Sequence, residues 1–255
     1  MGVEADLYLR HDGNGKEVIL VGHSSKSLTP QRTLKSLYLD PLLRILDNEN
    51  RRGTYEEIHN QTRPVGVFDR DVNATVILLL DFKSGSKDLF PLILSALDPL
   101  RSKGYLTTWT SNSNMITPGP LTIVASGNAR YEEVTSNTSY RDIFLDAPLS
   151  SISDPKYNTT NSYYASISLK QAVGYLWGGK FSSSQLQIIK KQIKAARDKG
   201  LKPRYWETIS WPIPWRNGVW RTLMNEDTGI LNVDDLESAA RWNWNFCVVA
   251  GFVLC

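Results

Sequence analysis

The sequence has few cysteines and little excess of charge of either sign. It contains 2 cysteines in 255 residues, Cys247 and Cys255, and both lie near its C-terminal end. A disulfide framework running through the domain is therefore excluded. The formal net charge is only +3, and lysine and arginine are scattered rather than clustered. We expect no nucleic-acid partner, because binding to nucleic acid normally requires a concentrated positive surface.

Long apolar runs are also missing. The most apolar stretch lies in the C-terminal tail, residues 241–255, and it is shorter than the ~20 apolar residues that a transmembrane helix needs. We interpret this atypical tail as a final strand or packed terminus. A frame-shifted end is an alternative, and a membrane anchor is the least favoured one. We therefore predict no transmembrane helix in this chain.

Targeting signals give two conflicting indications. The first residues contain neither the basic nor the apolar region of a signal peptide, and Asp6 replaces the Ser or Thr of a myristoylation motif. However, N-x-S/T triplets begin at Asn60, Asn73, Asn137 and Asn158, and such triplets favour a secretory route. We therefore expect a glycoprotein of the secretory pathway or the extracellular space.

Strands and helices are predicted to alternate along the chain. Residues 3–9 and 17–22 are β-rich runs joined by a turn rich in Gly and Asn, which is typical of a hairpin. Residues 76–80 are apolar at every position, as in a buried parallel strand. Ser182 and Gln185 can form a capping box at the start of a helix over 185–199. Further strands are predicted at 121–124, 143–145, 202–206 and 230–233, with helices from Asp40, from about Leu89 and around 219–223.

This alternation is compatible with two architectures, a doubly wound sheet and a (β/α)₈ barrel. No Gly-rich phosphate-binding loop follows a predicted strand. Polar side chains stand at the ends of several strands instead, which favours the barrel because active sites of barrels lie at the carboxyl ends of their strands. The sequence contains neither an internal repeat nor a linker, so we predict a single domain over residues 1–255.

The first and third predicted strands carry the best candidates for a metal site. Glu4 and Asp6 alternate with apolar residues, so their carboxylates lie on one face and can share a hard cation. Asp81 follows the most apolar strand and can supply a third oxygen ligand, with Lys83 as a phosphate partner. The structural alternatives are a solvated strand face for the first pair and a salt-bridged strand end for the second.

Three further residues are candidates for proton transfer and substrate contact. His23 ends the second hairpin strand, beside Glu4 and Asp6, whereas the other two histidines lie in polar stretches. Trp206 and Asn232 end late strands, where a tryptophan can pack on a substrate and an asparagine can bind a phosphate oxygen. Glu207, Asp146 and Asp234 also follow strands, but each can do no more than cap the following helix.

The candidate residues together resemble the phospholipase C-like phosphodiesterases, which include glycerophosphodiester phosphodiesterases and sphingomyelinase D. The shared features are E-x-D, a histidine after a hairpin, D-x-K, a late tryptophan and a late asparagine. The chain is most similar to a fungal branch, the altered inheritance of mitochondria protein six family, over nearly its whole length. The segments that carry this resemblance are Val3–Asp6, Val21–His23, Arg32–Pro41, Leu80–Lys83, Arg141–Pro148, Asn161–Ser166 and Leu231–Leu236.

The resemblance implies a fold, a cofactor and an activity. It implies a TIM-type (β/α)₈ barrel that binds a divalent cation, Mg²⁺ or Ca²⁺, through Glu4, Asp6 and Asp81. It implies that His23 acts as acid or base and that Lys83 contacts the phosphate. The expected activity is metal-dependent hydrolysis of glycerophosphodiesters or lipid phosphodiesters, with charge on the phosphoryl oxygens stabilised by metal and lysine.

The chain departs from the family at its start. Relatives carry a first strand with a first catalytic histidine ahead of E-x-D, whereas only three residues precede Glu4 here. We therefore expect an N-terminally incomplete barrel that lacks its first strand. Losing one proton-transfer group reduces the rate about 10²–10⁴-fold, so the activity is expected to be impaired.

Two other functions remain open. The first is a pseudoenzyme that binds a phosphodiester or lipid headgroup without turnover. The second is a glycoside hydrolase, since carboxylates and tryptophans at strand ends suit sugars. Lys83 next to Asp81 fits a phosphate better than a sugar, so the glycoside hydrolase is the less favoured of the two.

Overall fold

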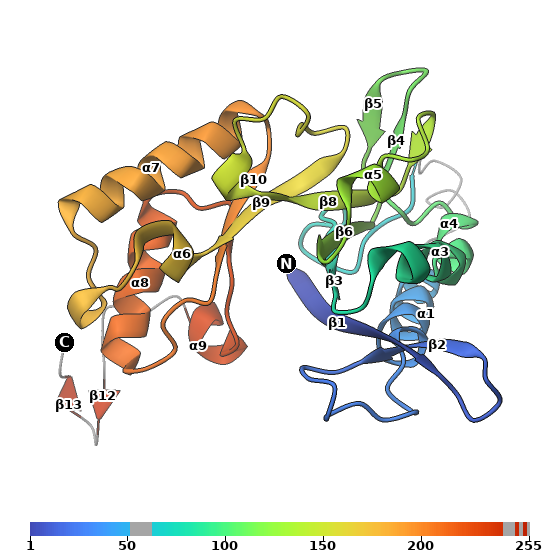
Figure 1. Ribbon diagram of the computed structural model, residues 1–255, viewed down its shortest axis with the longest axis horizontal. Helices are drawn as coiled ribbons and strands as arrows, with labels where there is room; N and C mark the ends of the chain where they lie inside the picture. The colour runs from blue at the N-terminus through green and yellow to red at the C-terminus, as the bar shows by residue number, and fades with distance from the viewer. Residues whose placement is uncertain (52–62, 242–247, 250–251, 254–255) are drawn as a thin grey trace. The chain divides into compact units, whose positions relative to one another are not determined.

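The computed structural model describes residues 1–51, 63–241, 248–249 and 252–253 (Figure 1). The chain divides into two compact units, Met1–Leu145 and Asp146–Cys255. The tail predicted over 241–255 lies largely outside the described residues. Within it, the strands β12 (Val248–Val249) and β13 (Phe252–Val253) pair antiparallel.

The first unit opens with the predicted hairpin, which is confirmed. Strands β1 (Gly2–His11) and β2 (Glu17–Val21) pair antiparallel. The carboxylate of Asp12 closes the turn by accepting hydrogen bonds from the backbone N–H groups of Asn14 and Lys16, at 2.8 and 2.9 Å. An aspartate that bonds the backbone ahead of it is a common device for forming such turns.

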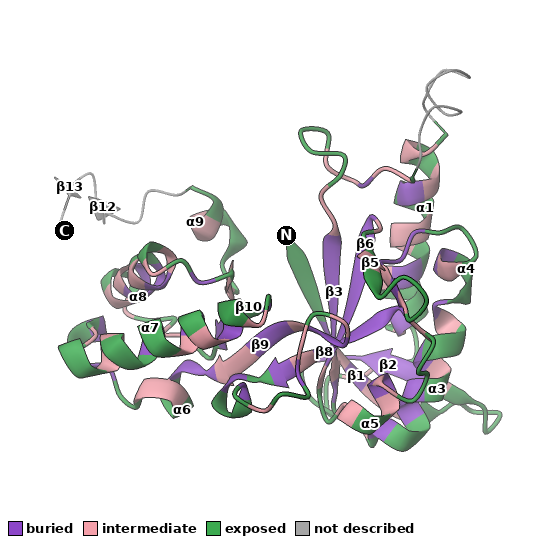
Figure 2. Cartoon of the chain, turned by 90° about the horizontal axis from the view of Figure 1, so that it is seen from above, coloured by how far each residue is buried: buried purple, intermediate pink, exposed green. Residues whose placement is uncertain are grey.

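Strand β3 (Val76–Phe82) is the centre of the first unit. It lies between β1 and β6 (Leu121–Gly127) and runs parallel to both. Figure 2 shows β3 and β6 buried along most of their length. This explains the continuous apolar run in the sequence, because a strand covered on both faces has no need of polar alternation.

Helices and short strands complete the first unit. Helix α1 (Asp40–Glu49) and helix α3 (Ser86–Ala96) contribute buried side chains such as Leu46 and Ile93 to its core. Strands β4 (Thr108–Thr110), β5 (Met115–Thr117) and β7 (Tyr140–Arg141) form a separate small sheet. The remaining elements of this unit are η1 (Lys35–Leu39), α4 (Asp98–Arg101) and α5 (Tyr131–Val134). Strand β8 (Ile143–Pro148) begins in the first unit and ends in the second.

The helix predicted from Asp40 is confirmed, because α1 begins at Asp40 and has Pro41 in its first turn. Asp40 is not the N-cap that an aspartate before a proline would indicate. The π-helix η1 leads directly into α1, so the backbone of Asp40 is already helical and its N–H donates to the Lys35 carbonyl. Thr33 and Ser36 cap the start of this longer segment, because the N–H of each donates to the hydroxyl of the other, at 3.1 and 3.0 Å.

In the second unit, β9 (Ser162–Ser168) and β11 (Ile230–Leu231) each run parallel to β10 (Lys202–Trp206). The predicted capping box at Ser182 and Gln185 is confirmed at the start of α7. The other elements of this unit are η2 (Leu149–Ser151), α6 (Leu169–Val173), η3 (Trp177–Gly179), α7 (Ser183–Asp198), α8 (Ile213–Asn225) and α9 (Leu236–Ala240). Among the described residues, no helix is both long enough and apolar enough to cross a bilayer.

The predicted TIM-type barrel lacking its first strand is wrong, although the chain is α/β. The strands form an open, mostly parallel arrangement in which β2 is an antiparallel edge. A barrel closes when its last strand pairs with its first, but β1 already pairs with β3 on one side and β2 on the other. The outer edge of β2 is also occupied, because the Val21 N–H donates to the Arg32 carbonyl at 2.8 Å.

The aspartate that caps α9 predicts a pH dependence of stability. Hydrogen bonds from Ser238, and then from Arg216, lower the pKa of Asp235 from 3.8 to about 2. Because this pKa is lower in the folded protein, the charged form stabilises the fold above pH 3.8, and the contribution is lost as the pH falls toward 2. We expect Asp235→Asn to flatten this part of the stability profile, measured by urea unfolding at each pH. Asp234→Asn is the control, and identical profiles for Asp235→Asn and wild type would contradict the prediction.

Candidate functional site

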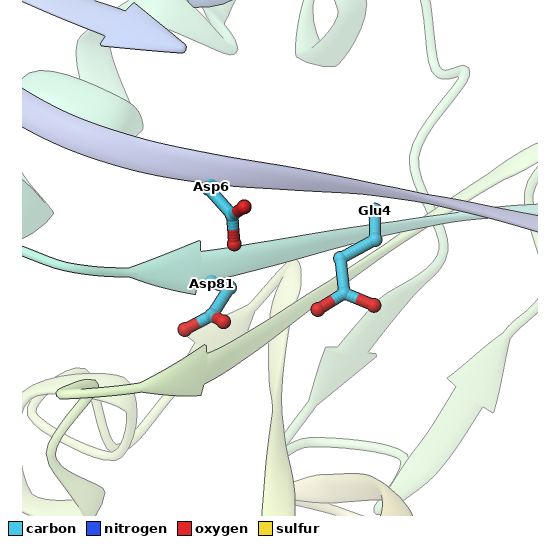
Figure 3. A group of neighbouring side chains, drawn as sticks. All are labelled: Glu4, Asp6 and Asp81. Atoms are coloured by element: carbon cyan, nitrogen blue, oxygen red, sulfur yellow. The ribbon is translucent and has the colours of Figure 1, made fainter. Parts of the chain in front are cut away.

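Three carboxylates converge on one face of the central strands of the first unit. Asp6 in β1 and Asp81 in β3 are direct partners in the parallel register, and Glu4 lies two residues before Asp6. Carboxylate oxygens of all three lie within 4.8 Å of one another. Figure 3 shows Glu4 and Asp6 projecting from β1 beside Asp81 on β3. The structure thus brings together the three residues that the sequence predicted as metal ligands.

The alternation of side chains along β1 explains this arrangement. Ala5 and Leu7 point to the opposite face and are fully buried. Because neighbouring side chains of a strand point to opposite sides, anchoring these two in the core directs Glu4 and Asp6 the other way. Asp81 is held in the same manner, since both of its neighbours in β3 are buried. The side chains of Asp6 and Asp81 are mostly buried, whereas Glu4 is exposed.

Asp81 has an unsatisfied oxygen that bears on metal binding. Its Oδ1 atom is buried and has no hydrogen-bond partner among the described residues. A buried carboxylate oxygen without a partner is costly, and coordination of a cation would satisfy it. The donor set consists only of carboxylate oxygens, which suits hard cations such as Mg²⁺ and Ca²⁺ rather than soft transition metals. The residues present therefore fit a divalent cation.

A glycine gives Asp81 the room that it needs. Gly127 ends β6 with a φ of +66°, in the left-handed region that favours glycine. A Cβ atom at this position would lie 2.0 Å from Asp81 Oδ1 and 2.8 Å from the Phe82 carbonyl oxygen. No side chain larger than hydrogen fits there without moving Asp81, so Gly127 belongs to the site although no sequence motif indicates it.

Lys83 supplies the positive charge between the carboxylates. Its Nζ atom lies 3.1 Å from Asp6 Oδ1 and 2.5 Å from Asp81 Oδ2. Burial lowers the pKa of Lys83, but the hydrogen bonds and charges of Asp81 and Asp6 outweigh it, so the pKa lies above its usual value. The carboxylates of Asp6 and Asp81 thus hold the Lys83 ammonium at the edge of the cluster.

His23 lies beside the same cluster and is open to solvent. Its Nδ1 atom is 3.6 Å from Asp6 Oδ2, and its side chain is 100% exposed. This distance is too long for a hydrogen bond but close enough for an ion pair when the imidazole is protonated. The hairpin brings the residue before His23 close to Asp6, because the Gly22 N–H donates to the Asp6 carbonyl at 3.3 Å. The backbone next to His23 is thus held beside Asp6, and the imidazole is accessible to a ligand.

Comparison with known families matches residues 1–146 to the AIM6-like phosphodiesterase domain. The chain belongs to this family. It therefore contains a phosphodiesterase-type domain, and the resemblance to the fungal family is confirmed. The three carboxylates Glu4, Asp6 and Asp81 lie in the matched part of the AIM6-like chain, as do Lys83 and His23.

Curated fungal relatives extend the similarity of the AIM6-like chain beyond this domain. The altered inheritance of mitochondria protein 6 homolog of Arthroderma benhamiae is 38% identical over 242 residues, which cover 94% of this chain and 73% of that protein. The altered inheritance of mitochondria protein 6 of Eremothecium gossypii is 30% identical, covering 94% of this chain and 63% of the relative. The Saccharomyces cerevisiae protein of the same name is 29% identical, and the match covers 88% of this chain and 61% of that protein. The chain thus spans less than two thirds of the length of the latter two relatives. No solved structure matches it.

The two predicted substrate-contacting residues of the AIM6-like chain lie in its second unit. Trp206 ends β10 and is partly exposed. Asn232 follows β11, and its Oδ1 atom accepts hydrogen bonds from Arg204 Nε and Nη2 at 3.1 and 2.7 Å. Arg204 is buried and also contacts Asp146 at 3.5 Å. The roles of Trp206 and Asn232 in substrate binding stay predictions.

Arg204 was missed by sequence reasoning. The available signal was a lone arginine inside the short strand 202–206, two residues before Trp206 and therefore on the same face. A charged residue within a strand that is otherwise buried needs a partner. The tertiary structure supplies Asp146 and Asn232.

The sequons of the AIM6-like chain differ in exposure. Asn73 and Asn137 are exposed, whereas Asn158 is half-buried and its Nδ2 atom donates to the Lys156 carbonyl at 3.4 Å. Asn60 lies outside the described residues, as does His59. Glycan attachment requires an accessible asparagine nitrogen, so Asn73 and Asn137 are the better acceptor sites. Glycosylation and a secretory location stay predictions.

Proposed function

We propose that this chain is a metal-dependent phosphoric diester hydrolase acting on glycerophosphodiesters or lipid phosphodiesters. The observation that carries the proposal is the cluster of Glu4, Asp6 and Asp81, whose carboxylate oxygens lie within 4.8 Å of one another beside Lys83. Membership of a phosphodiesterase family supports the same reaction class. The carboxylates would hold Mg²⁺ or Ca²⁺, and the bound cation would polarise a phosphoryl oxygen as a Lewis acid.

In this proposal, Lys83 binds the phosphate. An ammonium group has three N–H donors, and two of these face Asp6 and Asp81. One donor is left for a non-bridging phosphoryl oxygen, where the positive charge stabilises the negative charge that builds up during displacement. The two carboxylates keep Nζ in place before substrate arrives, so binding requires little reorganisation.

In this proposal, His23 moves the proton. Its Nδ1 atom faces Asp6, which leaves Nε2 for the substrate side. In hydrolysis, Nε2 takes a proton from the attacking water as the new P–O bond forms, and a proton must also reach the departing alcohol oxygen as the old P–O bond breaks. The Asp6 carboxylate stabilises the imidazolium formed in the first of these transfers.

The proposed reaction predicts an absolute dependence on divalent cations. We expect the chain to release alcohol from bis(p-nitrophenyl) phosphate or glycerophosphocholine with added Mg²⁺ or Ca²⁺, and to lose this activity in EDTA. Saturating cation should also stabilise the fold, by about 2.7 kcal/mol at a concentration 100 times the dissociation constant. Thermal unfolding with and without EDTA measures this effect without turnover. Activity that persists in EDTA would contradict the proposal. Cleavage of p-nitrophenyl glycosides, but not of phosphodiesters, would favour the glycoside hydrolase instead.

A second candidate is a protein that binds a phosphodiester headgroup without turning it over. It is favoured by the histidines of the described residues, because His23 lies at the cluster whereas His11 is opposite Glu17 at the far end of the hairpin. A single proton-transfer group cannot serve both the attacking water and the departing alcohol at once, and each such group contributes about 10²–10⁴-fold. Saturable, cation-dependent binding of glycerophosphocholine without product would favour this candidate.

A further inference from the structure

Four large apolar side chains form an exposed surface on the second unit. Tyr175, Trp177, Trp211 and Ile213 are 61%, 82%, 73% and 41% exposed. We call these four residues the aromatic surface. Most apolar side chains of comparable size in the described part of the chain are buried. Exposed aromatics that occur together, rather than singly, mark interaction sites.

Local packing brings the two segments of the aromatic surface together. The rings of Tyr175 and Trp177 contact each other edge to face, with centroids 5.1 Å apart. Two residues further on, Gly179 lies so close to Trp215 that a Cβ atom on the glycine would be 2.4 Å from the Trp215 Cβ. Element η3 therefore packs on the first turn of α8. Trp211 leads directly into this turn, in which the Trp215 N–H donates to the Pro212 carbonyl at 3.0 Å.

The charge on the first segment of the aromatic surface is positive. Lys170 and Lys180 are exposed on either side of the segment that contains Tyr175 and Trp177. Residues 169–182 contain no aspartate or glutamate. In the second segment, Arg216 is paired with Asp235 at 2.7 Å. The segment with Tyr175 and Trp177 is thus complementary to an anionic partner.

The combination of residue types identifies the partner. Tryptophan and tyrosine are enriched both at protein interfaces and in the headgroup region of bilayers, where their rings are apolar and their N–H or O–H groups remain hydrated. Lysine separates the two cases, because it is depleted in protein interfaces but is attracted to anionic lipids. We propose that the aromatic surface docks on an anionic lipid bilayer, with Trp177 and Trp211 in the headgroup region and Lys170 and Lys180 at lipid phosphates.

This inference goes beyond the proposed hydrolysis and is tested without turnover. Vesicles of phosphatidylcholine, with and without phosphatidylserine, are sedimented with the full chain in EDTA, and the bound fraction gives a partition coefficient. We expect binding to increase with phosphatidylserine and to fall with added salt. Trp177→Ala with Trp211→Ala should reduce the partition coefficient about tenfold or more, because the apolar area of both rings is no longer buried. Each of Lys170→Ala and Lys180→Ala should reduce it about fivefold.

A matched control is Leu236→Ala, which removes another exposed apolar side chain, 62% exposed, between the acidic residues Asp235 and Glu237. It should leave the partition coefficient unchanged. Quenching of tryptophan fluorescence by brominated lipids provides a second measurement on the unmodified chain. Failure of the full chain to bind phosphatidylserine vesicles, or equal binding by the double tryptophan variant, would overturn the proposal. A dimer that becomes monomeric in the double variant, without vesicle binding, would assign the aromatic surface to self-association instead.

Discussion

Replacing Asp81 by asparagine is expected to reduce divalent-cation affinity and the proposed phosphodiesterase activity by more than about 100-fold. Residues that merely support metal ligands contribute about 10–100-fold, so the loss of a charged ligand should cost more. The substitution preserves the shape of the side chain but removes the charge and replaces one of the two oxygens, Oδ1 or Oδ2. Titration calorimetry with Mg²⁺ and Ca²⁺ measures the affinity, and initial rates on bis(p-nitrophenyl) phosphate measure the activity.

The folded state of Asp81→Asn should remain intact, because an amide oxygen can still accept the hydrogen bond that Lys83 donates to Asp81. Thermal unfolding in EDTA tests this expectation. Asp40→Asn is the matched control, since it removes an exposed carboxylate of the same unit that pairs with Lys35. Wild-type cation affinity in Asp81→Asn would eliminate the three-carboxylate site. If Asp81→Asn loses cation affinity as expected but neither it nor the wild type shows activity, the binding protein is favoured over the enzyme.

Replacing Gly127 by alanine is expected to affect both cation binding and stability. The new Cβ would lie 2.0 Å from Asp81 Oδ1, so either the carboxylate or the end of β6 must move. We expect cation affinity to fall at least about tenfold, in the range found when the support of a metal ligand is disturbed. The left-handed φ of +66° adds a stability cost of about 1–2 kcal/mol for a residue with a Cβ. Titration calorimetry and urea unfolding measure the two effects separately.

Gly104→Ala separates backbone strain from the clash at Asp81. Gly104 has a φ of +70°, close to that of Gly127, but a Cβ there would meet no atom within 4 Å. Backbone strain should therefore lower the stability of Gly104→Ala by about the same 1–2 kcal/mol, while its cation affinity should equal that of the wild type. If both variants bind cation equally well, the proximity of Gly127 to Asp81 has no role in the site.

Much of the candidate site could be predicted from the sequence because it depends on local rules. The period of two along a strand places Glu4 and Asp6 on one face, and this needs no knowledge of the rest of the chain. The apolar run 76–80 predicts a buried parallel strand with Asp81 at its end. The hairpin turn and the capping box of α7 were likewise predictable, because each is formed by neighbouring residues.

The errors and omissions concern contacts between residues that are distant in sequence. The barrel was predicted from strand–helix alternation, from polar residues at strand ends and from the family resemblance, but none of these reveals which strands form edges. The pairing of Leu20 with Thr33 occupies the end of the outer edge of β2, and no periodicity in the sequence indicates that contact. No periodicity indicates the contact of Gly127 with Asp81, 46 residues apart, or the hydrogen bond from Arg204 to Asn232, 28 residues apart.

The sequence by itself determined the strand that carries Glu4 and Asp6, the buried strand that ends at Asp81, and the resemblance to a phosphodiesterase family. These features follow from side-chain alternation, apolar runs and short motifs, all of which act over a few residues. Only the tertiary structure decided that the sheet is open, that Asp6 and Asp81 are paired in register, and that Tyr175, Trp177, Trp211 and Ile213 are exposed. Strand order, register and exposure are set by the packing of the surrounding chain, because each depends on which distant residues compete for the same edge or the same core.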